Sequence, residues 1–78
     1  MLKKKLSLIL TFATTTQAMA VESYCHRQGL PGRLIPVPRE ITAGCGLSWK
    51  AAPEEKDLLL TALADSELQW LACHIIEV

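Results

Sequence analysis

Two prolines separated by a single residue, Pro36 and Pro38, constrain this chain more than any other local feature. Proline has no backbone N–H and disfavours helical angles in the residue before it. A strand can therefore run into this segment but cannot continue through it in the middle of a sheet. The sequence predicts a strand over residues 33–37 that leaves the sheet and enters a loop.

This loop contains Cys45, which lies between Gly44 and Gly46. Glycines adopt backbone angles that other residues avoid, and they add no side chain that would screen the sulfur, so we expect an exposed thiol. Arg39 precedes Cys45 by six residues and Lys50 follows it by five. If the loop folds back, these cations would favour the thiolate, which is the nucleophilic form of cysteine. The segment predicts a reactive cysteine.

Length and composition narrow the class of protein. A chain of 78 residues predicts a single domain over residues 1–78, and half of the residues are hydrophobic, which is enough for one core. Eight basic and eight acidic side chains cancel, so binding to nucleic acid has no electrostatic support. Three irregularly spaced cysteines fit reduced thiols better than a secreted disulfide framework. We therefore expect a cytoplasmic protein that binds neither nucleic acid nor membrane.

The N-terminus allows a second interpretation. Lys3, Lys4 and Lys5, an apolar run over residues 6–12 and the Ala-Met-Ala triplet that ends at Ala20 resemble an export signal. If residues 1–20 are such a signal, the protein is exported. Alternation of apolar and polar residues over the same run favours a first strand instead, and cleavage would leave a fragment too short to cover its core. The run is also far shorter than the ~20 residues of a membrane span.

The rest of the chain alternates between strand and helix patterns. Thr14 and Gln17 have the spacing of a capping box, and Gly29 suits the end of the helix that follows. A third strand begins at Leu47, a second helix begins at Pro53, and residues 70–78 form a fourth strand. The expected apolar helix positions are Ala18, Val21 and Cys25, and then Leu58, Leu59, Ala62 and Leu63.

This order predicts an α+β fold. The expected arrangement is a small ferredoxin-like βαββαβ open sandwich, with two helices on one face of a four-stranded sheet. Trp49 and Trp70 should pack in the core or at its edge.

The central segment also resembles a known family. The run Leu-Ile-Pro-Val-Pro-Arg-Glu-Ile-Thr-Ala-Gly-Cys-Gly-Leu, residues 34–47, is similar to the signature of the small bacterial and archaeal family named putative Se/S carrier protein-like. The strand, threonines and helix that precede it resemble the opening of that family. The resemblance implies that Cys45 holds sulfur or selenium as a persulfide or selenopersulfide. The implied partners are a cysteine desulfurase-like donor and a sulfur- or selenium-using acceptor protein, and the supporting motif residues are Pro36, Pro38, Arg39, Gly44 and Gly46.

A different function is possible if the thiol is incidental. The chain would then be a small protein-binding or regulatory module that recognises its partner through residues 36–46, with Arg39 or Trp49 in the contact. The sequence contains no phosphate-binding loop and no defensible catalytic triad, so a carrier without its own enzymatic activity is favoured over a self-sufficient enzyme.

Two further cysteines, Cys25 and Cys73, are each followed by a histidine, His26 and His74. Structural zinc sites bring their ligands in close pairs, which this spacing lacks, so we expect no metal and no cofactor. Both cysteines are interpreted as small hydrophobic residues. Whether either one acts as a resolving thiol for Cys45 stays open.

Overall fold

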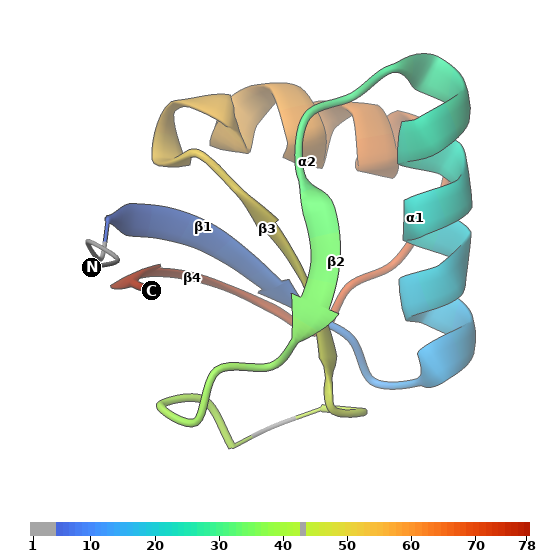
Figure 1. The fold of residues 1–78 in the computed structure, drawn as a ribbon. Helices are drawn as coiled ribbons and strands as arrows, with labels where there is room; N and C mark the ends of the chain where they lie inside the picture. The colour runs from blue at the N-terminus through green and yellow to red at the C-terminus, as the bar shows by residue number, and fades with distance from the viewer. Residues whose placement is uncertain (1–4, 43) are drawn as a thin grey trace.

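The computed structural model describes residues 5–42 and 44–78, so Lys3 and Lys4 of the basic stretch and Ala43 of the predicted loop lie outside the described residues. Figure 1 shows strands and helices in the predicted βαββαβ order. The elements are β1 (Leu6–Thr11), α1 (Thr15–Gln28), β2 (Arg33–Pro36), β3 (Leu47–Ala51), the 3-10 turn η1 (Pro53–Glu55), α2 (Lys56–Asp65) and β4 (Ala72–Glu77).

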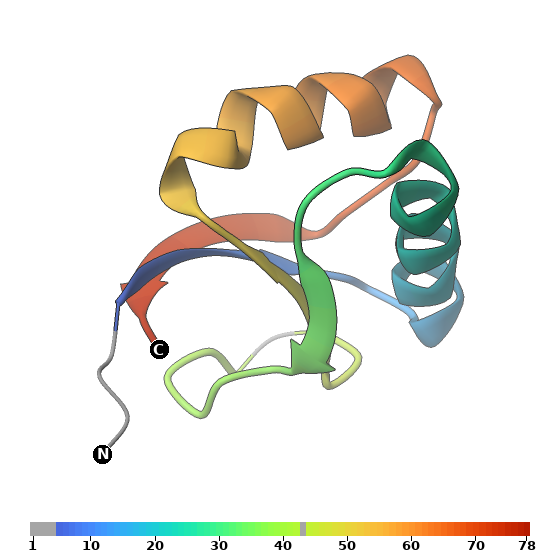
Figure 2. The ribbon, with the colours of Figure 1, turned by 45° about the horizontal axis from the view of Figure 1, so that its top comes forward.

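The four strands form one antiparallel sheet in the order β2-β3-β1-β4. Both helices cover the same face of this sheet (Figure 2), which confirms the predicted ferredoxin-like open sandwich. The residues that resemble an export signal include β1, a central strand paired on both sides. The proline-containing strand β2 lies at an edge, as the missing backbone donor of Pro36 requires.

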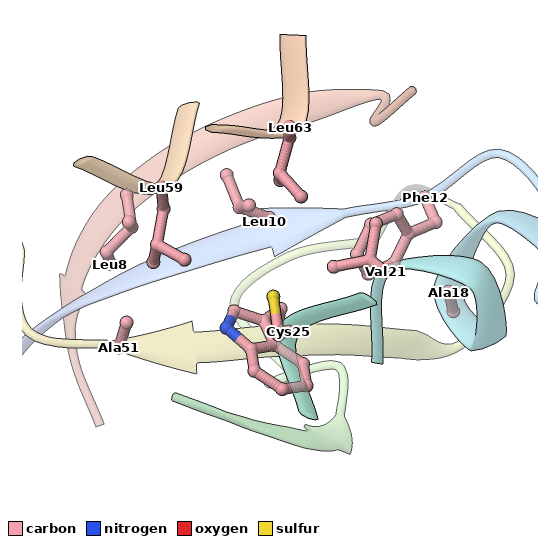
Figure 3. Packing of buried hydrophobic residues seen from close by; sticks show 10 residues of the cluster. Leu8, Leu10, Phe12, Ala18, Val21, Cys25, Ala51, Leu59 and Leu63 are labelled. Atoms are coloured by element: carbon pink, nitrogen blue, oxygen red, sulfur yellow. The ribbon is translucent and has the colours of Figure 1, made fainter. Parts of the chain in front are cut away.

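The core lies between the helices and the sheet (Figure 3). Alternation along the first strand places Leu8, Leu10 and Phe12 toward the helices, and each of them is fully buried. Burial of such a side chain contributes roughly 1.5–3 kcal/mol to folding. The predicted stripe of α1 is confirmed, and Leu59 and Leu63 of α2 are buried with it. The prediction for Leu58 is wrong, because this side chain is 55% exposed on the flank of α2.

The loop between β2 and β3 lies on the other face of the sheet, away from the helices (Figure 2). On that face Ile9, Thr11 and Ser48 are completely buried although no helix covers them. Ile41, in the loop, is only 8% exposed. The ends of the loop are joined, since the backbone N–H of Val37 donates to the carbonyl oxygen of Gly46 at 2.9 Å. The loop is therefore a packed part of the fold.

Several element boundaries differ from the sequence expectation. The second strand ends at Pro36, one residue early, because Val37 bonds to the loop end instead of the ladder. The fourth strand begins at Ala72 and not at residue 70. The second helix opens with the 3-10 turn η1, and the side chain of Glu55 accepts a hydrogen bond from the backbone N–H of Ala52 at 2.8 Å.

The caps of α1 follow the predicted chemistry with one change. Thr14 accepts a hydrogen bond from the backbone N–H of Gln17 at 3.1 Å, as a helix N-cap does. The side chain of Gln17 accepts from Ala13, one residue before the cap, and not from the cap itself. Gly29 ends the helix with a positive φ of 67°, as predicted.

Candidate functional site

Two backbone hydrogen bonds fix the segment around Cys45 at one end of the sheet. The N–H of Cys45 donates to the carbonyl oxygen of Phe12 at 2.9 Å, just beyond the end of β1. The carbonyl oxygen of Gly46 accepts from Val37, just beyond the end of β2. Cys45 is thus held between the ends of a central strand and an edge strand, two residues before β3 begins.

The glycines on either side of Cys45 are required for different reasons. Gly44 has a φ of 94°, and a Cβ atom there would lie 2.6 Å from the Phe12 carbonyl oxygen. This oxygen is the one that accepts the Cys45 N–H, so a side chain at residue 44 would collide with the anchor of the loop. Gly46 has a φ of 92° with open space around it. Glycine is therefore favoured at residue 46 only because of the positive φ, and not because a side chain would collide with a neighbour.

The thiol of Cys45 is half-buried and packs against the hydrophobic core cluster. Its Sγ atom lies 3.9 Å from the carbonyl oxygen of Leu47, which is a long and weak S–H···O contact. Cys45 is less exposed than the sequence predicts, because the glycines turn the chain back onto the sheet instead of projecting it into solvent. Cys45 therefore retains partial access to solvent.

The two cations that flank Cys45 in sequence are placed differently. Lys50 pairs with Ile9 and Arg33 near the far end of β3, about 10 Å along the strand from Leu47 at ~3.3 Å per residue. The fold therefore does not bring its backbone to the Cys45 end of the sheet. Arg39 lies in the same loop as Cys45 and is exposed.

The exposed part of the loop is a tight turn. The N–H of Ile41 donates to the carbonyl oxygen of Pro38 at 2.9 Å, which leaves Arg39 and Glu40 at the centre of the turn, both exposed. Ile41, which closes the turn, is buried, so the turn has a buried apolar residue directly beside its two exposed charged side chains.

The other two cysteines differ from Cys45 in burial. Cys25 in α1 has no exposed surface, and burial raises the pKa of its thiol, so it stays protonated and is a poor nucleophile. Cys73 in β4 pairs with Leu10 and is half-buried on the helix side. All three cysteines are free thiols.

The histidines do not assemble a centre with these cysteines. His26 is exposed on α1, whereas His74 lies beside Ile9 on the helix-free face, and its Nε2 atom is buried without a hydrogen-bond partner. Over residues 5–42 and 44–78, no three His, Cys, Asp or Glu side chains come together in a way that could hold a metal ion.

An apolar hollow lies at the same end of the sheet as Cys45. It has a volume of about 410 Å³ and includes Trp70 and Leu71, of which Leu71 is 49% exposed. The N–H of Leu71 donates to the carbonyl oxygen of Thr11 at 2.7 Å, while Cys45 bonds to the next carbonyl, that of Phe12. The hollow and the thiol are therefore attached to consecutive residues at the end of β1.

Sequence reasoning did not identify this role of Phe12. The backbone carbonyl of Phe12 accepts the hydrogen bond from Cys45. No local sequence pattern predicts this contact, because it depends on how the loop returns to the sheet. The sequence predicted an apolar run over residues 6–12, but not which segment would bond to the end of that run.

No helix in the described part of the chain has the length and apolar character needed to cross a bilayer. Comparison with protein families gives a match over residues 7–75 to the family described as "Putative Se/S carrier protein-like". The matched range includes Cys45 and nearly all of the fold. Comparisons with curated proteins and with solved structures gave no match.

Proposed function

Because the chain belongs to the family described as "Putative Se/S carrier protein-like", we propose that it carries sulfur or selenium on Cys45. The observation that carries the proposal is the anchored Gly-Cys-Gly segment at the end of the sheet. There, the backbone that bears a free, half-buried cysteine is fixed by hydrogen bonds to residues just beyond the ends of two strands. A carrier needs a reachable sulfur at a defined place, and little else.

The loading step is a displacement at sulfur. The Cys45 thiolate attacks the outer sulfur of a persulfide on the donor protein, the donor S–S bond breaks, and the donor cysteine leaves as a thiolate. Cys45 then carries the outer sulfur as a persulfide. The outer sulfur keeps its oxidation level, so the exchange needs no external oxidant or reductant. The same displacement with selenium as the outer atom gives a selenopersulfide.

Delivery is the same reaction with a different attacking group. A nucleophile of the acceptor attacks the outer sulfur or selenium, and the Cys45 thiolate is the leaving group. Neither step requires a substrate pocket, because each occurs within a complex of two proteins.

The partners we propose are a cysteine desulfurase-like donor and a sulfur- or selenium-using acceptor protein, in the cytoplasm, where thiols stay reduced. Both must reach the same sulfur in turn. Two surfaces near Cys45 support such contacts: the exposed turn with Arg39 and Glu40, and the apolar hollow with Leu71. The charged turn favours orientation of a partner, and the apolar hollow favours affinity.

Transfer of sulfur from a cysteine desulfurase to an acceptor, reconstituted with and without this protein, tests the proposal. We expect Cys45→Ser to reduce the carrier-dependent transfer to background, because a serine oxygen cannot form a persulfide. Cys73→Ser, which removes another half-buried thiol, should retain transfer.

Two results would replace this proposal. Transfer unchanged by Cys45→Ser excludes a carrier thiol at this position. If, in addition, Arg39→Ala loses capture of the partner while Cys45→Ser binds it normally, the chain is a binding module that uses residues 36–46 and the thiol is incidental.

A further inference from the structure

A second hollow lies at the opposite end of the sheet from Cys45. It has a volume of about 540 Å³, which falls in the range of ~300–1,000 Å³ that small-molecule sites occupy. Three cationic side chains line it, Lys5, Arg33 and Lys50. They come from three neighbouring strands or their extensions, so the fold and not the local sequence brings them together.

Two of these cations are direct cross-strand partners. Arg33 of β2 lies opposite Lys50 of β3 in the antiparallel register, and opposed residues project from the same face of a sheet. Like charges in this position destabilise a strand pair. The repulsion between the Arg33 and Lys50 side chains is relieved when an anion lies between them.

Lys5 adds a third positive charge on the same face. Its backbone N–H and carbonyl oxygen both bond to Val78, at 3.3 and 3.1 Å, which extends the pairing of β1 and β4 by one residue. Strand alternation then places Lys5 on the face shared by Ser7 and Ile9. Because Ile9 lies opposite Lys50, this is also the face of the Arg33 and Lys50 side chains.

The acidic side chain that lines the hollow, that of Glu55, already accepts a hydrogen bond. Glu55 accepts the hydrogen bond from the Ala52 backbone N–H at 2.8 Å, which caps the turn before α2. Cationic side chains therefore outnumber carboxylate side chains in the lining by three to one.

The wall beside Arg33 is held in place by the core. The indole N–H of Trp49, whose side chain is 3% exposed, donates to the carbonyl oxygen of Pro31 at 3.1 Å. Gly32 follows with a φ of 113°, and a Cβ atom there would collide with that indole and lie 2.7 Å from the Lys50 carbonyl oxygen. The turn that leads to Arg33 is thus packed directly on Trp49, which fixes the backbone on this side of the hollow.

We propose that this hollow, lined by Lys5, Arg33 and Lys50, binds a small phosphate-bearing molecule. A phosphate group presents several acceptor oxygens, which matches an Arg guanidinium and two ammonium groups that approach from different strands. The clustering of the three cationic side chains at one corner of the sheet favours a small molecule over an extended acidic peptide. The site lies at the opposite end of β3 from Cys45 and does not depend on the thiol function.

Binding of inorganic pyrophosphate to the full chain, followed by backbone amide and indole N–H resonances in heteronuclear NMR, tests the proposal. We expect shifts that saturate at Gly32, Arg33, Lys50 and the Trp49 indole, with sodium chloride at equal ionic strength as the reference. Lys50→Gln and Arg33→Gln should each weaken binding at least about tenfold, as loss of one charge-assisted contact worth roughly 1.5–3 kcal/mol implies.

The matched control is Lys56→Gln, which removes the same charge from an exposed residue outside the hollow. We expect its affinity for pyrophosphate to stay within about twofold of the wild type. Dispersed spectra of all variants would show that each is folded.

Three outcomes would overturn the proposal. One is equal weakening by Lys50→Gln and Lys56→Gln, which indicates unspecific attraction. Another is that sodium chloride reproduces the shifts. The third is saturable binding of a poly-glutamate peptide in the hollow where pyrophosphate gives none, which indicates a peptide site instead.

Discussion

Gly44→Ala is expected to destabilise the protein by roughly 2–5 kcal/mol. A positive φ costs a residue with a side chain about 1–2 kcal/mol, and forcing a methyl group into occupied space costs about 1–3 kcal/mol more. The occupied space is the Phe12 carbonyl oxygen, a backbone atom that cannot turn aside as a side chain does. The added methyl group should also break the hydrogen bond from the Cys45 N–H to that oxygen. Urea unfolding measures the change.

Gly46→Ala is the matched control for this prediction. Its φ of 92° nearly equals the 94° of Gly44, but nothing lies within 4 Å of the position its Cβ would take. It should therefore cost only the conformational part, about 1–2 kcal/mol. Equal effects of the two substitutions would contradict the packing of Gly44 against the end of β1.

Phe12→Ala is expected to destabilise the protein by about 3–5 kcal/mol, because a fully buried ring is replaced by a methyl group and leaves a cavity. A chain of 78 residues has a total stability of roughly 4–12 kcal/mol at 0.05–0.15 kcal/mol per residue. The variant should consequently be largely unfolded at temperatures where the wild type is folded. Thermal unfolding followed by circular dichroism measures this loss.

Met19→Ala serves as the comparison for Phe12. Met19 lies on α1 but is 53% exposed, so its truncation should change stability by less than about 1 kcal/mol. A loss for Phe12→Ala as small as that for Met19→Ala would contradict the position of Phe12 between β1 and the helices.

Much of the fold could be predicted from local patterns. The capping spacing at Thr14, the glycine at residue 29 and the alternation along β1 each depend on a few neighbouring residues, and the structure confirms the elements they predict. The prediction that Leu58 is buried was wrong because the apolar stripe of α2 is narrower than the run of leucines. Only part of that run faces the sheet. Hydrophobicity alone cannot tell which of two adjacent leucines points inward.

The site was less predictable because it depends on contacts between distant segments. The Gly-Cys-Gly pattern located Cys45, but the half-burial of its thiol follows from the bond to Phe12, thirty-three residues earlier. The sequence also left open whether Lys50 approaches the thiol, because that depends on how the loop folds back. An extended strand carries each further residue away from Cys45. The register places Lys50 opposite Arg33, in the hollow lined by Lys5, Arg33 and Lys50.

The most direct test of the carrier proposal is intact-protein mass spectrometry without reductant, after incubation with a cysteine desulfurase and cysteine. We expect the wild type and Cys73→Ser to gain the mass of one sulfur atom and to lose it on reduction. Cys45→Ser should gain no such mass. Selenocysteine with a selenium-releasing donor should give the corresponding gain of one selenium. Absence of any gain on the wild type, with a donor that loads a known acceptor in parallel, or an equal gain on Cys45→Ser, would contradict a carrier thiol at Cys45.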